Sequence, residues 1–234
     1  MWNNKKISVV FPCYDEELNI RKAISDFFDT GVVDEIIAVD NNSKDNTASE
    51  IKKTNAIYVF ESKQGYGNAL QCGLRKATGD LIFTAEPDGT FLGNDIFKFF
   101  PYSDEFDVVF GTRTAKSLIW EKAKMDWLMR VANVIVAKFL AQLHNGPSLT
   151  DVGCTLKMIS KEGLSVIQDK FTVGGNHFSP EYMILCLRNK LKCVEIPVNY
   201  LERVGESKIT SNFKKSARLA IIIIGLTIRY KFKK

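Results

Sequence analysis

The chain has 234 residues, of which 45% are hydrophobic and 25% are charged, and this is the composition of an ordinary globular protein. Its net charge of +5 arises from 32 basic and 27 acidic residues. Seven of the basic residues lie in the segment 213–234, which contains no acidic residue. Because the rest of the chain is close to neutral, we expect no nucleic-acid-binding surface, and the basic end needs a local explanation.

The cysteines indicate the compartment. There are five of them, an odd number, and they are widely scattered with no CxxC pair, which argues against a disulfide framework and against a zinc site. We expect buried structural thiols in a reducing compartment. The apolar run before Pro12 is too short for the core of a signal peptide, and no stretch reaches the roughly 18 apolar residues of a membrane span.

The first hundred residues alternate between strand and helix patterns. In chain order we predict a strand over 7–11, a helix over 17–28, a strand over 35–39, a helix over 46–53, a strand over 57–60, a helix over 68–77 and a strand over 81–84. Short apolar strands between amphipathic helices predict a parallel sheet that is covered on both faces.

The second half is less regular. It predicts a long helix over 118–143, a strand over 156–159, a helix over 180–188 and a final strand over 193–198. No repeat or linker divides the chain, so we expect one domain over 1–211, followed by a basic amphipathic helix over 212–234.

The last predicted helix has ten strongly apolar residues at 219–228 between two basic flanks. This stretch is too short to span a bilayer, but a helix lying in the interface of an anionic membrane fits the pattern. A core helix with a solvated basic tail fits it equally well, and both interpretations stay open.

Polar loops follow three of the predicted strands, at 12–17, 40–45 and 86–90. Ligands of parallel sheets bind beyond the carboxyl ends of the strands. Three acidic loops on one edge therefore predict a site for a cation with an anionic ligand. The alternative is that Asp and Asn only cap the following helices, which for Asp45 alone is equally plausible.

The segments around these loops read VVFPCYDEELNI, DNNSKDNT, KQGYGNAL and EPDGTF. In this order and spacing they resemble family 2 glycosyltransferases of the GT-A fold. The later segments FGTR, DVGCTLKMIS, FSPEYM and NYLERVGESKI resemble the branch of dolichyl-phosphate mannose synthase and the bacterial polyprenyl-phosphate glycosyltransferases. The resemblance runs from about Ile7 to Ile209 and implies a three-layer α/β/α sandwich with a mostly parallel sheet and a Rossmann-like nucleotide-binding half.

The resemblance also implies roles for individual residues. The positions that would line or approach the nucleotide are Pro12, Tyr14, Glu16, Asp40, Asn42, Asp45, Lys63, Gly65 and Gly67, with Asp40 on the base. The metal-binding pair would be Glu86 and Asp88. The basic positions that handle phosphates would be Arg113, Arg130, Arg203 and Lys208. Catalysis would accordingly rest on Asp88 together with the cations Arg113, Arg203 and Lys208.

A metal at the acidic pair has a chemical reason. The pyrophosphate of a nucleotide sugar gains negative charge as it leaves, and a divalent ion offsets that charge. Hard oxygen ligands favour Mg²⁺ or Mn²⁺. Glu86-Pro87-Asp88-Gly89 is also an ordinary turn sequence, which is the alternative. The site departs from the family at Glu86, where Asp is commoner, and at Thr90, where relatives often have an amide.

The acceptor is the subtler question. A sugar hydroxyl needs a general base, and relatives that build polysaccharides carry a Glu-Asp pair where this chain has Phe178-Ser179-Pro180-Glu181. A lipid phosphate is already anionic and needs cations instead. If the acceptor were a hydroxyl, Asp151 or Glu181 would be the base. Lys157 stands where relatives usually have Arg, and we give it only a supporting role.

These observations predict an inverting enzyme that moves one sugar from a UDP- or GDP-sugar to a polyprenyl (dolichyl or undecaprenyl) phosphate on the cytoplasmic face of a membrane. The expected partners are the donor, the lipid acceptor and an anionic membrane surface, but no nucleic acid. Two alternatives are a glycan or glycolipid hydroxyl as acceptor, and a catalytically silent nucleotide-sugar-binding protein. The base, the sugar, and a homo-oligomer or membrane partner protein are left open.

Overall fold

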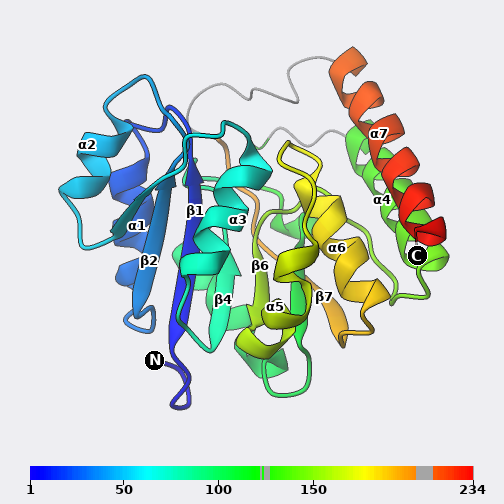
Figure 1. The fold of residues 1–234 in the computed structure, drawn as a ribbon, viewed down its shortest axis with the longest axis horizontal. Coiled ribbons are helices and arrows are strands. Elements are labelled where there is room, and N and C mark those ends of the chain that lie inside the picture. Colours follow the sequence, from blue (N-terminus) through cyan, green and yellow to red (C-terminus); the bar gives the residue numbers. More distant parts are fainter. Residues whose placement is uncertain (122, 124–126, 204–212, 234) are drawn as a thin grey trace.

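The computed structural model describes residues 1–121, 123, 127–203 and 213–233. Seven strands form one sheet between two helical layers (Figure 1). The strands are β1 (Ile7–Cys13), β2 (Glu35–Asp40), β3 (Ile57–Phe60), β4 (Leu81–Thr84), β5 (Val108–Thr112), β6 (Lys157–Ser160) and β7 (Cys193–Pro197). The α-helices are α1 (Ile20–Phe28), α2 (Thr47–Lys52), α3 (Tyr66–Lys76), α4 (Trp127–Leu143), α5 (Lys161–Ile167), α6 (Phe178–Arg188) and α7 (Phe213–Phe232).

The sheet has the strand order β3-β2-β1-β4-β6-β5-β7. Strands β3, β2, β1 and β4 are mutually parallel, as the alternation of short strands and helices predicts. Strand β6 runs antiparallel to both of its neighbours, β4 and β5, while β7 is parallel to β5. The expected mostly parallel three-layer sandwich is therefore confirmed.

Alternate side chains of the strands supply two hydrophobic cores. On one face Val10, Val39 and Phe110 pack with residues of α3, α4, α5, α6 and α7. On the other face Val9 and Phe11 pack with α1 and with the 3₁₀ segment that contains Ile96. Burial on both faces explains why the central strands are continuous apolar runs rather than alternating ones.

Helix α7 packs against α4 and α6 and lies beside α4 at the edge of the molecule (Figure 1). Its buried face includes Ile223 and Leu226. The Tyr230 hydroxyl donates a hydrogen bond of 2.6 Å to Glu181 of α6. None of the helices in the described part of the chain is both long and apolar enough to cross a bilayer.

The predicted elements need one correction and two additions. The helix expected over 118–143 begins at Trp127, and residues 116–118 form a 3₁₀ turn instead, since Ile119 pairs with Tyr200 in an isolated bridge. Strand β5 and helix α5 were not predicted. Strand β5 has only five residues, and α5 has a glycine at its third position, so neither gives a strong periodic pattern.

Candidate active site

The polar loops after β1 and β2 lie side by side and are joined by hydrogen bonds. Cys13 at the end of β1 is in register with Asp40 at the end of β2. The backbone N–H of Glu17 donates to the Asp45 carboxylate at 3.0 Å, and the N–H of Lys44 donates to Asp15 at 2.8 Å. The predicted juxtaposition of these loops is confirmed, and the third loop, after β4, lies next to them through the β1–β4 pairing.

Beyond this edge lies a cavity of about 380 Å³, here called the Tyr14 cavity. Its lining comes from the loop after β1, from the loop and helix start at 64–69, and from the acidic loop after β4. The lining residues include Pro12, Tyr14, Glu16, Asn41, Gly65, Glu86 and Arg203. A volume of this size holds a compact organic ligand.

A second cavity of about 320 Å³, the Arg113 cavity, adjoins the first. Its wall contains charged residues, among them Asp88, Arg113 and Arg203, and apolar residues, among them Leu219 and Ile223 of α7. Four residues line both cavities: Tyr66, Glu86, Asn176 and Arg203. Two ligands, one in each cavity, would therefore meet at this shared wall.

Asp88 lines the Arg113 cavity beside the shared residues Glu86 and Arg203, and it is 0% exposed. One carboxylate oxygen of Asp88 accepts hydrogen bonds from the N–H and the hydroxyl of Thr90, at 3.0 and 2.6 Å. The other oxygen, Oδ2, receives no hydrogen bond from the described residues, although Nη1 of Arg203 lies 3.2 Å away. A buried carboxylate oxygen without a donor is costly unless a ligand completes it.

Arg203 faces three carboxylates. Its guanidinium lies 3.2 Å from Asp88, 3.6 Å from Glu16 and 4.0 Å from Glu86. The backbone N–H of Leu201 donates to the carbonyl of Thr90 at 3.0 Å, which fixes the segment that carries Arg203 beside the acidic loop. Burial and the neighbouring charge of Asp88 raise the pKa of Glu86 to about 8.

The acidic pair fits a divalent cation that is also bound by its substrate. Among the described residues no three His, Cys, Asp or Glu side chains are grouped to hold a metal by themselves. Glu86 and Asp88 supply two carboxylates, and Oδ2 of Asp88 accepts no hydrogen bond from the described residues. Mg²⁺ and related hard cations commonly use one or two carboxylates together with substrate phosphates. These two residues would hold the metal.

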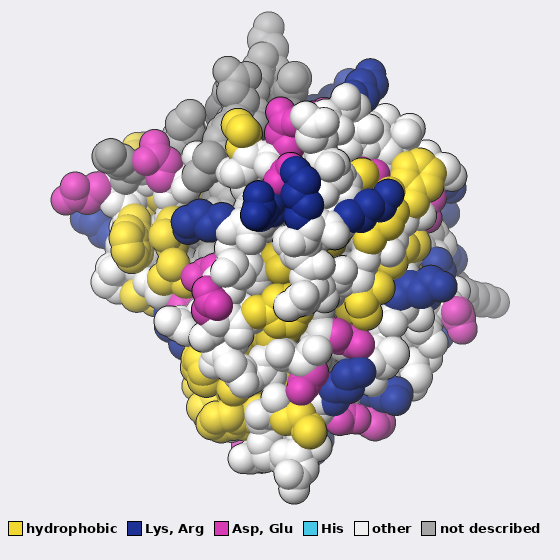
Figure 2. Space-filling view, turned by 90° about the vertical axis from the view of Figure 1, so that its left-hand side faces the viewer, with side chains coloured by type: hydrophobic (Ala, Val, Ile, Leu, Met, Phe, Trp, Pro, Cys, Tyr) yellow, Lys and Arg dark blue, Asp and Glu magenta, His cyan; other side chains and the backbone are white. Residues whose placement is uncertain are grey.

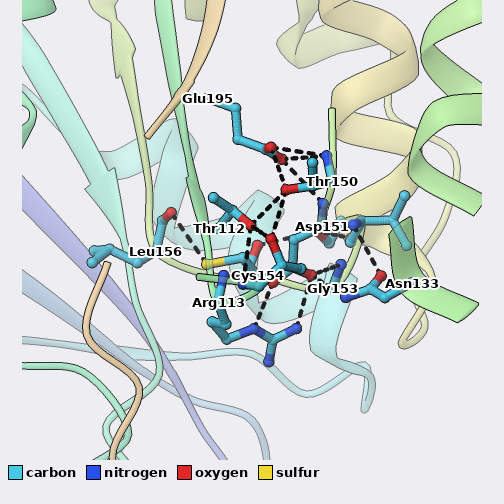
Figure 3. Close-up of polar contacts among 12 residues, drawn as sticks. Thr112, Arg113, Asn133, Thr150, Asp151, Gly153, Cys154, Leu156 and Glu195 are labelled. Atoms are coloured by element: carbon cyan, nitrogen blue, oxygen red, sulfur yellow. Dashed lines mark hydrogen bonds and ion pairs between the residues drawn. The ribbon is translucent and has the colours of Figure 1, made fainter. Parts of the chain in front are cut away.

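Arg113 follows β5 and is held by Asp151 (Figure 3). The Asp151 carboxylate accepts from the backbone N–H of Arg113 at 3.0 Å, from Nε at 2.8 Å and from Nη2 at 3.0 Å. Burial opposes the ionised form of Asp151, but the Arg113 charge and its hydrogen bonds outweigh it and lower the pKa to about 2. The carboxylate is therefore ionised and fully engaged.

Both base candidates from the sequence are already engaged in hydrogen bonds, and they line neither cavity. Asp151 is bound to Arg113, and Glu181 is 0% exposed and accepts hydrogen bonds from the N–H groups of Thr172 and Val173 and from the Tyr230 hydroxyl. A carboxylate saturated by such donors is a poor general base. Both residues stabilise the fold around the Arg113 cavity.

Several residues predicted for the nucleotide line neither cavity. Asp40 accepts from the N–H of Ser43 at 3.0 Å and from the Tyr58 hydroxyl at 3.3 Å, and Asp45 binds Thr47 at the start of α2. The predicted residues that do not line either cavity are Asp40, Asn42, Asp45, Lys63 and Gly67. Lys208 lies outside the described residues.

The remaining predictions have these outcomes. A Cβ on Gly67 would meet the carbonyl oxygen of Val173 at 2.3 Å, so this glycine is required for close packing of α3 on the 173–174 loop. Arg130 lies on α4 and lines neither cavity. Lys157 is 2% exposed and donates to Ser179 at 2.9 Å and to the Cys154 carbonyl, so it supports the loop before β6 from behind the Arg113 cavity.

Sequence reasoning missed Asn41, Tyr66 and Asn176. The Asn41 side chain donates to the carbonyls of Glu61 and Lys63 and accepts from the N–H of Gly65 at 2.7 Å, so it shapes the wall of the Tyr14 cavity. Its position directly after Asp40 at a strand end was an available signal. Asn176 comes from a loop distant in sequence, and nothing local indicated it.

Comparisons with known proteins agree with this arrangement. The family model described as "Glycosyl transferase family 2" matches residues 8–167. An uncharacterized glycosyltransferase of Mycobacterium tuberculosis is 28% identical over 214 residues, covering 90% of this chain and 92% of that protein. The UDP-N-acetylglucosamine–dolichyl-phosphate N-acetylglucosaminyltransferase of Methanococcus voltae is 27% identical, covering 95% of this chain and 98% of that protein.

Solved structures show the same fold. Glucosyl-3-phosphoglycerate synthase from Mycobacterium tuberculosis, crystallised with Mn²⁺, uridine diphosphate and phosphoglyceric acid, superposes with a TM-score of 0.74 at 16% identity. The match covers 99% of this chain and 80% of that one. At this identity the similarity establishes the architecture of the sandwich.

Proposed function

Because the chain belongs to glycosyl transferase family 2, we propose that it transfers one sugar from a nucleotide-sugar donor to a polyprenyl phosphate, with inversion at the sugar. One observation carries the acceptor assignment. The wall of the Arg113 cavity contains two arginines, Arg113 and Arg203, together with apolar residues of α7, and both carboxylates that would serve as a base for a hydroxyl are already engaged.

The donor would occupy the Tyr14 cavity. The family membership supports a nucleotide sugar, and the relative from Methanococcus voltae is named for a UDP-sugar. The neighbouring structure of glucosyl-3-phosphoglycerate synthase contains uridine diphosphate together with Mn²⁺. Pro12, Tyr14 and Glu16 would surround the nucleotide, and the pyrophosphate would lie toward Glu86 and Arg203 at the shared wall.

Glu86 and Asp88 would hold Mg²⁺ or Mn²⁺ against the pyrophosphate. The metal, when bound, would neutralise charge on the departing nucleoside diphosphate. Arg203 lies within 4.0 Å of both carboxylates, so it is placed to turn to the pyrophosphate once a cation takes over the acidic pair. The guanidinium then serves as a second positive group for the leaving charge.

The acceptor phosphate would attack the anomeric carbon from the Arg113 cavity. A bond forms between a phosphate oxygen and this carbon while the carbon–oxygen bond to the nucleotide breaks, and the electron pair leaves with the nucleoside diphosphate. A single displacement inverts the anomeric centre. The thiols of Cys13 and Cys154 are buried and their pKa values are raised by burial, that of Cys154 to about 12, so neither provides a covalent nucleophile.

The lipid part of the acceptor would lie against the apolar residues of the Arg113 cavity. These are Val152 and Pro180 together with Leu219 and Ile223 of α7. Hydrocarbon attached to a phosphate would pack against these side chains. The Methanococcus voltae relative is named for a dolichyl-phosphate acceptor, which supports the same class of lipid.

The surface beside this cavity fits a membrane. The adjacent helices α4 and α7 present large apolar side chains to solvent, including Trp127 and Ile135, which are 69% and 63% exposed, and Ile221, which is 71% exposed. Basic residues Arg218, Arg229, Lys231 and Lys233 lie on α7 or at its end. Each basic residue near an anionic bilayer contributes about 1 kcal/mol of attraction. We propose that these helices lie on the cytoplasmic face of a membrane, with α7 as an interfacial helix after a transferase domain over 1–211.

The opposite end of the molecule is different (Figure 2). There, over α1 and α2, basic and acidic side chains are interspersed, and Glu50 is paired with both Arg21 and Lys53. Such a mixed surface offers no continuous positive face for nucleic acid.

A transfer assay tests the proposal. The purified chain is incubated with radiolabelled UDP- and GDP-sugars, with Mn²⁺ or Mg²⁺, and with either undecaprenyl phosphate or the matching alcohol, undecaprenol, in detergent. We expect transfer to the phosphate and none to the alcohol. Transfer to the alcohol or to a glycan hydroxyl would refute the phosphate acceptor, and donor binding without any transfer would favour a silent binding protein.

A further inference from the structure

Within the described part of the chain, the hydrogen bonds of the Arg113 guanidinium are made to Asp151 alone. Asp151 binds its Nε and Nη2, and the ring of Tyr200 lies 5.1 Å from the guanidinium carbon. A guanidinium bound in this way keeps three further N–H groups, two on Nη1 and one on Nη2, that are directed away from Asp151. Because Arg113 lines the Arg113 cavity, this side is where an anionic ligand would be bound.

Asp151 is itself held by Asn133 of α4 (Figure 3). The Asn133 amide donates to the Asp151 carboxylate at 2.5 Å, and its carbonyl oxygen accepts from the N–H of Val152 at 3.2 Å. The N–H of Gly153 also donates to Asp151, at 2.9 Å. The side chain of Asn133 thus fixes both the carboxylate and the backbone of the loop at 151–153.

Arg113 has a competing partner across the same cavity. The carboxylates of Glu86 and Asp88 line the same cavity as Arg113. Without Asp151 the guanidinium would be attracted to this acidic pair, where it would occupy the metal position instead of binding an acceptor. The buried carboxylate of Asp151 keeps Arg113 away from the acidic pair by accepting three hydrogen bonds from it.

We propose that Asn133 and Asp151 are positioning residues, which together hold Arg113 at the place where it binds the acceptor phosphate. The inference rests on the proposed function, because it takes the ligand of Arg113 to be the phosphate of a lipid acceptor. Asp151 sets the orientation of the guanidinium, and Asn133 sets the orientation of Asp151. The acceptor site is thereby connected to α4, the helix whose outer face is apolar.

Three variants and a control test this chain of contacts. Asn133→Leu keeps the branched shape of the side chain, with a larger volume, and removes both hydrogen bonds. Asp151→Asn removes the charge beside Arg113. The double variant Asn133→Asp with Asp151→Asn exchanges the two groups, so that an amide–carboxylate hydrogen bond between them remains while the carboxylate leaves Arg113. Gln142→Leu is the control, since it also replaces an amide of α4 by leucine, at an exposed position whose side chain makes no hydrogen bond to the described 151–153 loop.

The measurements are the KM for undecaprenyl phosphate, the Kd for the nucleotide, and the unfolding midpoint. We expect the acceptor KM to rise about tenfold in Asn133→Leu and by about tenfold to a hundredfold in Asp151→Asn, as for the loss of charge-assisted hydrogen bonds. The nucleotide Kd stays within about twofold, and the control keeps all three wild-type values. The exchange variant should recover the unfolding midpoint relative to Asp151→Asn without recovering KM, which a purely structural role would not produce.

The outcomes separate the two ideas. An acceptor KM that stays at the wild-type value in both single variants would overturn the positioning role while leaving the proposed function intact. Equal changes in acceptor KM and nucleotide Kd, or recovery of KM in the exchange variant, would also overturn it. A wild-type protein that transfers no sugar to undecaprenyl phosphate would refute the proposed function, and the inference with it.

Discussion

Replacing Arg203 by methionine should strengthen the binding of Mn²⁺ to the nucleotide-free protein. In the structure the guanidinium of Arg203 is the counter-charge of the acidic pair, with Nη1 3.2 Å from Asp88 and 4.0 Å from Glu86. A cation entering between these carboxylates must displace it. The variant Arg203→Met keeps much of the apolar stem and removes the charge.

The magnitude follows from the shorter contact. Two unit charges 3.2 Å apart attract each other by about 5 kcal/mol at an effective dielectric constant of 20. The Arg203 side chain is 29% exposed, so solvent screens the pair and the guanidinium regains hydration when it leaves. We therefore expect a net effect of about 1–2 kcal/mol, which corresponds to Mn²⁺ binding that is about 5- to 30-fold tighter.

Isothermal titration calorimetry with Mn²⁺ in the absence of nucleotide measures this change. Arg21→Met on α1 is the matched control, because it removes the same charge from a residue that pairs with Glu50, away from the acidic pair. The control should bind Mn²⁺ like the wild type. Unchanged or weaker Mn²⁺ binding in Arg203→Met would show that Arg203 does not compete with the metal, and the reasoning from the ion pairs would fail.

Three further predictions concern pH, stability and the membrane. The pKa of Glu86 is raised to about 8, so below this pH a proton must leave Glu86 before a cation binds. The Mg²⁺ affinity measured by calorimetry should therefore rise by about tenfold per pH unit from pH 6.5 to pH 8. In Glu86→Gln the Mg²⁺ affinity should not change with pH over this range. Tyr230→Phe removes the hydroxyl that donates a hydrogen bond to buried Glu181. The free energy of unfolding, measured by urea titration, should fall by about 1–3 kcal/mol. An unchanged free energy of unfolding would mean that water replaces the hydroxyl. The double variant Ile135→Glu with Ile221→Glu places negative charges on the exposed faces of α4 and α7. In a sedimentation assay it should bind vesicles that contain anionic lipid at least tenfold more weakly than the wild type, with an unchanged unfolding midpoint. Undiminished binding would place the membrane contact elsewhere on the protein.

The sequence by itself determined the architecture of the first half. The apolar runs at 7–11, 35–39, 57–60 and 81–84 are found in four mutually parallel strands, because strands buried on both faces must be apolar throughout and are recognised without knowledge of their partners. The same rule placed the loops around Tyr14, Glu16 and Glu86 at one edge, where the structure has the Tyr14 cavity. Burial of the scattered cysteines was predicted as well, and four of the five are buried.

The tertiary structure alone decided which charged residues are free for a ligand and which stabilise the fold. From the sequence alone, no feature distinguishes the carboxylates of Asp151, Glu181 and Asp88 as bound or available. Only the folded chain brings Arg113 to Asp151 and Tyr230 to Glu181, across 38 and 49 positions, and leaves one oxygen of Asp88 without a donor among the described residues. Local patterns reflect backbone periodicity and burial, whereas the availability of a carboxylate depends on donors from distant segments, which only three-dimensional packing brings together.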